Sequence, residues 1–265
     1  KKLGLATSDD LREVLMKRSK ACIESQQKKN LMSLESSLKK TPSYRCEKCH
    51  DMTFVIISDV AIPCDCRDIR ICEDILKQSG ISEEFRKKTF NSFNYSYDIQ
   101  TIDAYRKASG YYSDFNSIRK SRKNSIMFLG QVGSGKTHLC LAIANKLMDD
   151  GVGVVYMSYR DVIMRFKQNV MNEEEYVKLM DRYKKAKVLL IDDLFKGSVT
   201  KSDVNIVFEI VNFRYFNNLP MIVSCEKCVD ELLDIDEAIG SRLIEMSKDY
   251  LVQMKGKRLN FRVYG

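Results

Sequence analysis

The sequence lacks any apolar run approaching 18 residues, so we expect no membrane-spanning segment. The first residues, Lys1 to Asp10, are polar and contain no apolar h-region, so nothing in them resembles a signal peptide. The sequence also lacks an initiator methionine, which suggests that residues precede Lys1. Together these absences predict a cytoplasmic protein with no membrane among its partners.

Acidic residues are scarce in two stretches of a chain whose net charge is +8. Residues 1–45 contain 11 Lys and Arg against 5 Asp and Glu, and residues 106–123 contain six basic residues and one acidic residue. Such basic segments suggest nucleic acid or an acidic protein surface as a partner. For the N-terminal segment, a solvated face that aids solubility explains the charge equally well.

A glycine-rich stretch at residues 130–137 fits the phosphate-loop pattern G-x-x-x-x-G-K-[ST]. It follows a strand-like apolar run and precedes a helical pattern, which is the context that the pattern requires. Glycines let the backbone N–H groups turn toward phosphate oxygens, and the helix dipole adds partial positive charge there. Lys136 supplies a charge for the β- and γ-phosphates, and the Thr137 hydroxyl can ligate Mg²⁺. The predicted nucleotide-binding residues of this loop are Gly130, Gly133, Ser134, Gly135, Lys136, Thr137 and His138.

From residue 124 onward, strand-like runs alternate with helical patterns. This alternation predicts an α/β fold whose parallel sheet is covered by helices on both faces. The expected strands are 125–129, 152–157, 187–192, 220–224 and 249–254. The expected helices are 136–149, 160–184 (whole, or broken near Asn169), 202–217 and 237–247.

The third expected strand ends in two adjacent carboxylates, Asp192 and Asp193, which is the Walker B pattern. Asp192 would hold Mg²⁺, mostly through water, and Asp193 would orient the attacking water. Two unpaired carboxylates that close an apolar strand are costly unless a cation lies nearby. The two motifs together indicate a nucleoside triphosphate ligand, with ATP or ADP and Mg²⁺ as cofactors.

Four of the nine cysteines form two close pairs, Cys46 with Cys49 and Cys64 with Cys66, around a strand-like run. Two thiolate pairs of this kind build a tetrahedral Zn²⁺ site, and a domain of about 30 residues needs metal because its core is small. His50 could replace one cysteine, and four buried free thiols are the alternative. Beside a nucleotide-binding loop, the cysteines indicate a reducing cytosol rather than disulfides. The other five are interpreted as core or structural residues: Cys22, Cys72, Cys140, Cys225 and Cys228.

The N-terminal part reads as helix over residues 8–40, with a capping box of Thr7 and Asp10 at its start and Pro42 at its end. Its narrow apolar stripe either packs internally or docks on a partner. The sequence predicts four parts: residues 1–45 as a helical region, 46–67 as a zinc knuckle, 68–123 as a linker and basic helical segment, and 124–265 as the ATPase core. The helical pattern from Ile99 to Ile118 is interrupted by Gly110.

Several stretches resemble bacterial or phage replicative helicase loaders of the DnaC/DnaI type, in the AAA+ class. The matching motifs, besides the cysteine pairs, are GQVGSGKT at 130–137, VLLIDDLFKG at 188–197, NFRYFNNLPMIVS at 212–224, DIDEAIGSRLIEM at 234–246 and ISEEFRKKTFNSF at 81–93. The resemblance implies a hexameric replicative helicase as a partner, contacted through the N-terminal part, and single-stranded DNA contacted by the AAA+ core. It also implies self-association, in which Arg242 acts as an arginine finger on the ATP of a neighbouring subunit. A surface ion pair of Arg242 with Glu245 or Glu237 is the alternative.

The chain departs from the pattern of that family at two places. Glu226 occupies the position of the sensor-1 polar residue, usually Asn, which puts hydrolysis in doubt more than binding. Asp193, Glu226 and Arg242 are therefore the catalytic candidates of a slow ATPase. Only nineteen residues follow Met246, too few for a C-terminal helical lid, and the loader family is similar in lacking one. Two C-terminal arginines are expected on a final strand, so no sensor-2 arginine is assigned: Arg258 and Arg262.

Two other functions fit the same motifs. A transposition helper ATPase of the IstB type has a similar core, although that family is not known for a cysteine knuckle. A nucleotide-gated binding module that barely hydrolyses ATP also fits, since Asp193 is one methylene shorter than the Glu of many AAA+ enzymes. For single-stranded DNA, the candidates combine a stacking ring with charges, although an ordinary amphipathic helix explains them too: Tyr159, Arg160, Arg165 and Lys167.

Overall fold

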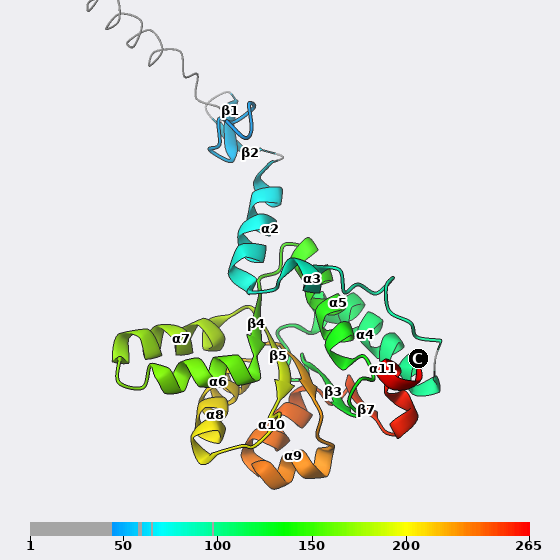
Figure 1. Ribbon diagram of the computed structural model, residues 1–265. Helices are drawn as coiled ribbons and strands as arrows, with labels where there is room; N and C mark the ends of the chain where they lie inside the picture. The colour runs from blue at the N-terminus through cyan, green and yellow to red at the C-terminus, as the bar shows by residue number, and fades with distance from the viewer. Residues whose placement is uncertain (1–43, 58–59, 65, 97) are drawn as a thin grey trace, which may run out of the picture. The chain divides into compact units, whose positions relative to one another are not determined.

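The computed structural model describes four stretches of the chain, residues 44–57, 60–64, 66–96 and 98–265 (Figure 1). The helix expected at residues 8–40, its capping box and Cys22 lie outside the described residues, as does the side chain of Cys72. The chain divides into two compact units, Lys1–Cys66 and Arg67–Gly265. Within the described stretches, no helix combines the length and apolar character that crossing a membrane requires.

The described part of the first unit is a β-hairpin. Strand β1 (Phe54–Ile57) pairs antiparallel with β2 (Val60–Pro63), so that Ile57 lies opposite Val60. The side chains of both strands are mostly exposed although nearly all of them are apolar. Helix α2 (Cys66–Ser79) begins at the last residue of this unit. With so little buried apolar area, the hairpin has no hydrophobic core that could hold it folded.

The second unit is built on a five-stranded sheet in the order β4-β5-β6-β3-β7, in which every neighbouring pair is parallel. Its strands are β3 (Ile126–Gly130), β4 (Val154–Ser158), β5 (Val188–Leu194), β6 (Met221–Cys225) and β7 (Leu251–Met254). Each of the five strands expected from the sequence has its counterpart here, and the predicted parallel sheet is confirmed. Figure 1 shows helices on both sides of this sheet.

Alternate residues of a strand point to opposite faces of the sheet. Helices cover both faces, so both sets of side chains are buried. In β3, Met127 and Leu129 join one apolar core, and Ile126 and Phe128 join the other. The first core is completed by helices α6 to α10, and the second by α4 and α5. Apart from Cys66, α2 belongs to this unit. The other helices of this unit are α3 (Glu83–Arg86), α4 (Ile99–Ile118), α5 (Lys136–Asp149), α6 (Tyr159–Gln168), α7 (Glu173–Lys185), α8 (Lys201–Phe216), α9 (Val229–Ile235), α10 (Glu237–Met246) and α11 (Phe261–Tyr264).

The structure decides one open expectation and corrects several others. The segment expected as helix over 160–184, whole or broken near Asn169, is broken there: Asn169 ends α6, and the Asn172 side chain caps α7. Helix α4 continues through Gly110 without interruption, and α9 was not expected. The prediction of a final strand carrying Arg258 and Arg262 is wrong. That segment forms a 3-10 turn, η1 (Lys257–Leu259), followed by α11. The helical turn starts there because the Asn260 side chain accepts a hydrogen bond from the backbone N–H of Arg262.

Arg214 is buried inside the second unit although it is charged. The residue is fully buried, and its guanidinium donates to four backbone carbonyls, of Tyr183, Lys184, Ala186 and Pro220, at 2.7 to 3.0 Å. Burial lowers the pKa of Arg214 to about 9, so the side chain keeps its proton at neutral pH. Arg214 therefore ties the end of α7 to the start of β6.

Candidate functional site

The phosphate loop lies between the end of β3 and the start of α5, as the motif requires. Its glycines Gly130, Gly133 and Gly135 have φ angles of 100°, 74° and 90°, in the region that favours glycine. A side chain on Gly133 would overlap that of Asn260, and one on Gly135 would come within 2.5 Å of Phe93. Glycine at these two positions therefore lets Asn260 and Phe93 pack against the loop. The loop leads into the N-terminus of α5, where free backbone N–H groups favour an anion.

Lys136 is almost fully buried at the first residue of α5. Its Nζ donates to the carbonyls of Gly130 and Gln131, at 2.8 and 2.7 Å. Burial lowers the pKa of Lys136, and the negative charges of Glu226 and Asp193 act in the opposite direction. These contacts hold the ammonium inside the loop, where phosphate oxygens would replace the two carbonyls.

Asp192 is the meeting point of three strands and the phosphate loop. One carboxylate oxygen accepts from the hydroxyls of Thr137, at 2.8 Å, and Ser224, at 2.6 Å, and the other accepts from the Tyr156 hydroxyl at 3.1 Å. Asp192 is only 7% exposed. Mg²⁺ is coordinated by oxygen atoms such as those of carboxylates and hydroxyls, so Thr137 and Asp192 fit the predicted magnesium site.

Asp193 and Glu226 are brought together by a third residue, Lys196. The Lys196 ammonium lies 2.7 Å from Asp193 Oδ2 and 3.0 Å from Glu226 Oε1. Asp193 has a φ of 55°, and its backbone N–H donates to the Ser224 hydroxyl at 2.8 Å. Sequence reasoning missed Lys196, although its position directly after the Walker B strand could have drawn attention to it.

These groups line one cavity of about 620 Å³. Two further walls come from segments outside the predicted site: Phe93 and Asn94 ahead of α4, and Leu259 and Arg262 at the C-terminal end. Sequence reasoning missed these four residues. For Phe93 the available signal was the stretch ISEEFRKKTFNSF at 81–93, which was matched only as a motif.

His138 also lines the cavity, and it anchors one of these walls. Its Nε2 lies 2.9 Å from the Thr89 carbonyl and 3.3 Å from the Ser92 hydroxyl, and its ring packs against Phe93. Burial lowers the pKa of His138. Through these contacts His138 positions the segment that carries Thr89, Ser92 and Phe93 beside the loop.

Arg242 does not line this cavity. Its guanidinium donates to the Ala238 carbonyl at 2.6 Å and lies 5.6 and 5.4 Å from the ring centres of Phe208 and Tyr215. In the described part of the chain it forms no ion pair with Glu237 or Glu245, and Glu245 instead accepts from the Tyr215 hydroxyl. An arginine finger that acts on the ATP of a neighbouring subunit would lie away from the ATP site of its own chain, as Arg242 does.

The expected DNA contacts on α6 need a correction. Tyr159 is only 3% exposed and packs in the core against Phe195, so its ring cannot stack on a base. Lys167 pairs with Asp203 at 2.6 Å. Arg160 and Arg165 remain exposed on this helix.

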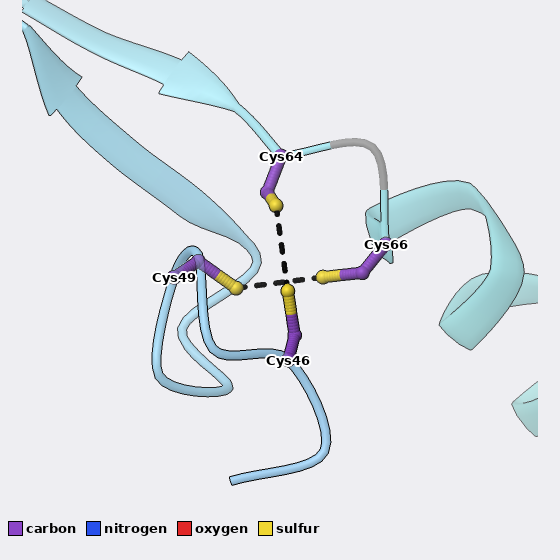
Figure 2. A group of neighbouring side chains, drawn as sticks. All are labelled: Cys46, Cys49, Cys64 and Cys66. Atoms are coloured by element: carbon purple, nitrogen blue, oxygen red, sulfur yellow. Dashed lines mark hydrogen bonds between the residues drawn. The ribbon is translucent and has the colours of Figure 1, made fainter.

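The four predicted zinc ligands lie together in the first unit. The sulfurs of Cys46, Cys49, Cys64 and Cys66 are all within 4.8 Å of one another, and Figure 2 shows the four side chains pointing toward a common centre. The distances are 3.8 Å between Cys46 and Cys64, and 3.4 Å between Cys49 and Cys66. A Zn–S length of 2.3 Å in a tetrahedron places sulfurs about 3.8 Å apart, so the cluster fits Zn²⁺. His50 is not part of this cluster, and its ring lies 4.5 Å from that of Tyr44.

The remaining described cysteines are buried or partly buried. Cys140 lies in the second core, and the thiol of Cys225 donates to the Leu194 carbonyl at 3.0 Å. Cys228 is half-buried at the start of α9. Among the described residues, the four-cysteine group is the one in which metal-ligating atoms gather.

Comparison with known proteins identifies the family to which this chain belongs. The family model described as "Bacterial DnaA ATPAse domain" matches residues 86–246. The chain is 41% identical over 203 residues to "Uncharacterized protein YqaM" of Bacillus subtilis (strain 168), covering 74% of this chain and 64% of that protein's length. It is 36% identical over 235 residues to "Phage-like element PBSX protein XkdC" of the same organism, covering 84% of this chain and 87% of that protein.

The fold comparison agrees. The structure "Crystal Structure of the DnaI" matches with a TM-score of 0.55 at 24% identity, covering 67% of this chain and 93% of that one. "Crystal structure of the DnaC helicase loader" matches with a TM-score of 0.55 at 20% identity, covering 66% of this chain and 100% of that one. The chain therefore belongs to the family of the bacterial DnaA ATPase domain, and it is an AAA+ ATPase with the fold of the DnaI and DnaC structures.

Proposed function

We propose that the chain is a helicase loader, which uses ATP to place a hexameric replicative helicase on single-stranded DNA. One observation carries the proposal: a single chain combines the Lys136–Asp192 nucleotide site, on the fold of the DnaI and DnaC structures, with a four-cysteine cluster ahead of it. The cluster also favours a loader over a transposition helper of the IstB type, which shares the core alone.

In this proposal the loop N–H groups and Lys136 bind the phosphates of ATP, and Thr137 and Asp192 hold Mg²⁺. The bound ion neutralises charge on the β- and γ-phosphates. Asp193 orients the attacking water, and Arg242 of a neighbouring subunit stabilises the charge that develops on the γ-phosphate.

The β1–β2 hairpin is our candidate for the helicase contact. Ile56, Ile57 and Val60 are 67%, 56% and 61% exposed, although they are strongly apolar. An exposed apolar cluster on a small domain commonly marks a protein contact. A zinc ion at the four cysteines would hold this hairpin in the shape that presents these side chains.

Single-stranded DNA would be bound mainly through its phosphates. Arg160 and Arg165 are the remaining candidates on α6, without a stacking ring from Tyr159. Binding that depends on phosphate contacts weakens steeply with salt.

The deciding experiment is a pull-down with the purified replicative helicase of the host, followed by loading onto circular single-stranded DNA. The wild-type chain with zinc and ATP should retain the helicase and load it. The variant Ile56→Ser/Val60→Ser should lose retention but keep ATP binding, and Val263→Ser, on exposed α11, is the matched surface control. If the wild-type chain retains no helicase, the proposal is wrong, and retention of a transposase instead would favour the IstB-type function.

A nucleotide-gated binding module is the second candidate. It is favoured by the ion pair of Asp193 with Lys196, because a carboxylate held by an ammonium is poorly placed to orient water. Turnover of ATP, measured with and without single-stranded DNA, separates the two. A module would bind ATP and show no turnover above background under either condition.

A further inference from the structure

Lys196 is a charged residue of the ATP cavity to which the proposed function gives no role. It follows β5 by two residues, and its side chain is 38% exposed. Its ammonium joins Asp193, at the end of β5, to Glu226, just after the neighbouring strand β6. All three line the same cavity as Lys136 and Thr137.

The backbone that carries Lys196 is fixed by the fold, whereas its ammonium is held by ion pairs with Asp193 and Glu226. Its N–H donates to the Asp193 carbonyl at 3.1 Å, which closes a turn. Phe195, the residue before it, is fully buried and has a φ of 56°. The ammonium can therefore move within the cavity by side-chain rotation alone, without unfolding the turn.

The two carboxylates that hold Lys196 lie close to where phosphates would bind. Asp193 and Glu226 line the same cavity as Lys136, and their negative charges act to raise the pKa of Lys136. A γ-phosphate beside Lys136 would therefore place further negative charge within reach of the Lys196 ammonium. Phosphate oxygens are strong acceptors for a lysine, and they would compete with the two carboxylates for it.

We propose that Lys196 is the residue that distinguishes ATP from ADP. Without a γ-phosphate, Lys196 stays paired with Asp193 and Glu226. When ATP binds, the ammonium exchanges these carboxylates for γ-phosphate oxygens, and Asp193 is released to orient water. This inference rests on the proposed function, because it requires that the cavity bind ATP.

The exchange predicts how Lys196 changes the ratio of the affinity for an ATP analogue to the affinity for ADP. In Lys196→Ala the affinity for a non-hydrolysable ATP analogue should fall about tenfold, the loss of one hydrogen bond between charged groups. The affinity for ADP should change less than about twofold, since ADP lacks the γ-phosphate. Lys196→Arg should restore most of the preference, and Lys187→Ala, an exposed lysine just before β5, is the matched control.

A second variant tests the exchange itself. Glu226→Gln removes one competitor for the ammonium, so the preference for the ATP analogue over ADP should rise. In the Lys196→Ala background, Glu226→Gln should leave the preference for the ATP analogue over ADP unchanged, because the Lys196 ammonium is absent. An equal rise in both backgrounds would mean that Glu226 repels the phosphate directly, and would overturn the exchange.

The measurement is equilibrium binding of the analogue and of ADP to each full-length variant by calorimetry. If the wild-type chain binds neither nucleotide, the proposed function fails before the inference is reached. If it binds both and Lys196→Ala keeps the wild-type ratio, Lys196 is a static ion pair and the inference is overturned. An equal loss of affinity for the ATP analogue and for ADP in Lys196→Ala would also overturn the inference.

Discussion

The cysteine hairpin and the nucleotide site are held together by different means. The hairpin leaves apolar side chains such as Ile56 in solvent, and its buried groups are sulfurs that converge on one point. The nucleotide site rests on two apolar cores, and its polar groups already satisfy one another, as Asp192 does with Thr137 and Ser224. A metal ion at the four sulfurs would hold the first region folded, whereas packing preorganises the second. Each can therefore be broken without the other.

Loss of zinc should have the largest effect. Structural zinc contributes about 10–16 kcal/mol in zinc-finger peptides, far more than the small hairpin can supply by packing. Cys64→Ser should therefore lose stoichiometric zinc and unfold the hairpin, and it should abolish helicase retention while ATP binding stays within about twofold.

Metal analysis by mass spectrometry and ATP binding check this prediction in parallel. Cys228→Ser, at a half-buried cysteine outside the cluster, is the control and should keep its zinc. Stoichiometric zinc in Cys64→Ser would contradict the four-cysteine site.

Removal of the Arg242 guanidinium should leave both regions folded and stop hydrolysis. Arginine fingers are worth roughly 10³–10⁵ in rate, so Arg242→Ala should bind ATP normally and hydrolyse it at least about 10³-fold more slowly. Steady-state turnover at a concentration that permits self-association is the measurement.

A mixture sharpens the test of Arg242. Chains with Arg242→Ala have an intact ATP site, and chains with Lys136→Ala have an intact finger. Mixing them should restore part of the activity at interfaces that combine the two. Normal turnover in pure Arg242→Ala protein would refute the assignment.

Arg214 stabilises the second unit as zinc would stabilise the first, but through hydrogen bonds inside a packed core. Arg214→Met should lower the free energy of unfolding by about 3–5 kcal/mol, because four buried carbonyls lose their donor. Chemical denaturation of the zinc-loaded chain measures this loss, and Arg165→Met, at an exposed arginine, is the control. A loss below about 1 kcal/mol would show that water or neighbouring groups replace the guanidinium.

The sequence was sufficient for the sheet because each strand is a local apolar run that ends in a recognisable turn. It was sufficient for the loop from Gly130 to Thr137 because that motif is contiguous. The places of Phe93 and Arg262 in the cavity wall were not predicted, since packing brings both residues to the loop across long separations in the chain. The motif at 81–93 was recognised, but nothing in it showed that Phe93 lies beside the loop. The segment with Arg258 and Arg262 was wrongly predicted to be a strand, because α11, with four residues, is too short to show a helical period in the sequence.

Lys136→Ala tests the loop alone. Without the ammonium the phosphate charge is uncompensated in a buried site, so the affinity for ATP should fall by about 100-fold or more. The fold should be unchanged, because Lys136 contacts only carbonyls of its own loop through Nζ. Fluorescent ATP binding and circular dichroism check the two statements, and unchanged affinity would contradict the assignment of the site.

Arg262 should give the smallest effect, and it tests whether the C-terminal end belongs to the nucleotide site. The Phe261 N–H donates to the Gly133 carbonyl at 3.1 Å, which places α11 against the phosphate loop and Arg262 in the wall of the cavity. Because Arg262 is exposed, solvent and salt screen its charge, and Arg262→Ala should weaken ATP binding only about three- to tenfold. The loss should shrink as salt is raised, since an electrostatic contact between exposed groups is screened. Val263→Ala, the next residue of the same short helix, should leave the affinity unchanged. Equal losses in the two variants, or a loss that does not depend on salt, would mean that α11 supports the loop by packing and that Arg262 makes no contact with phosphate.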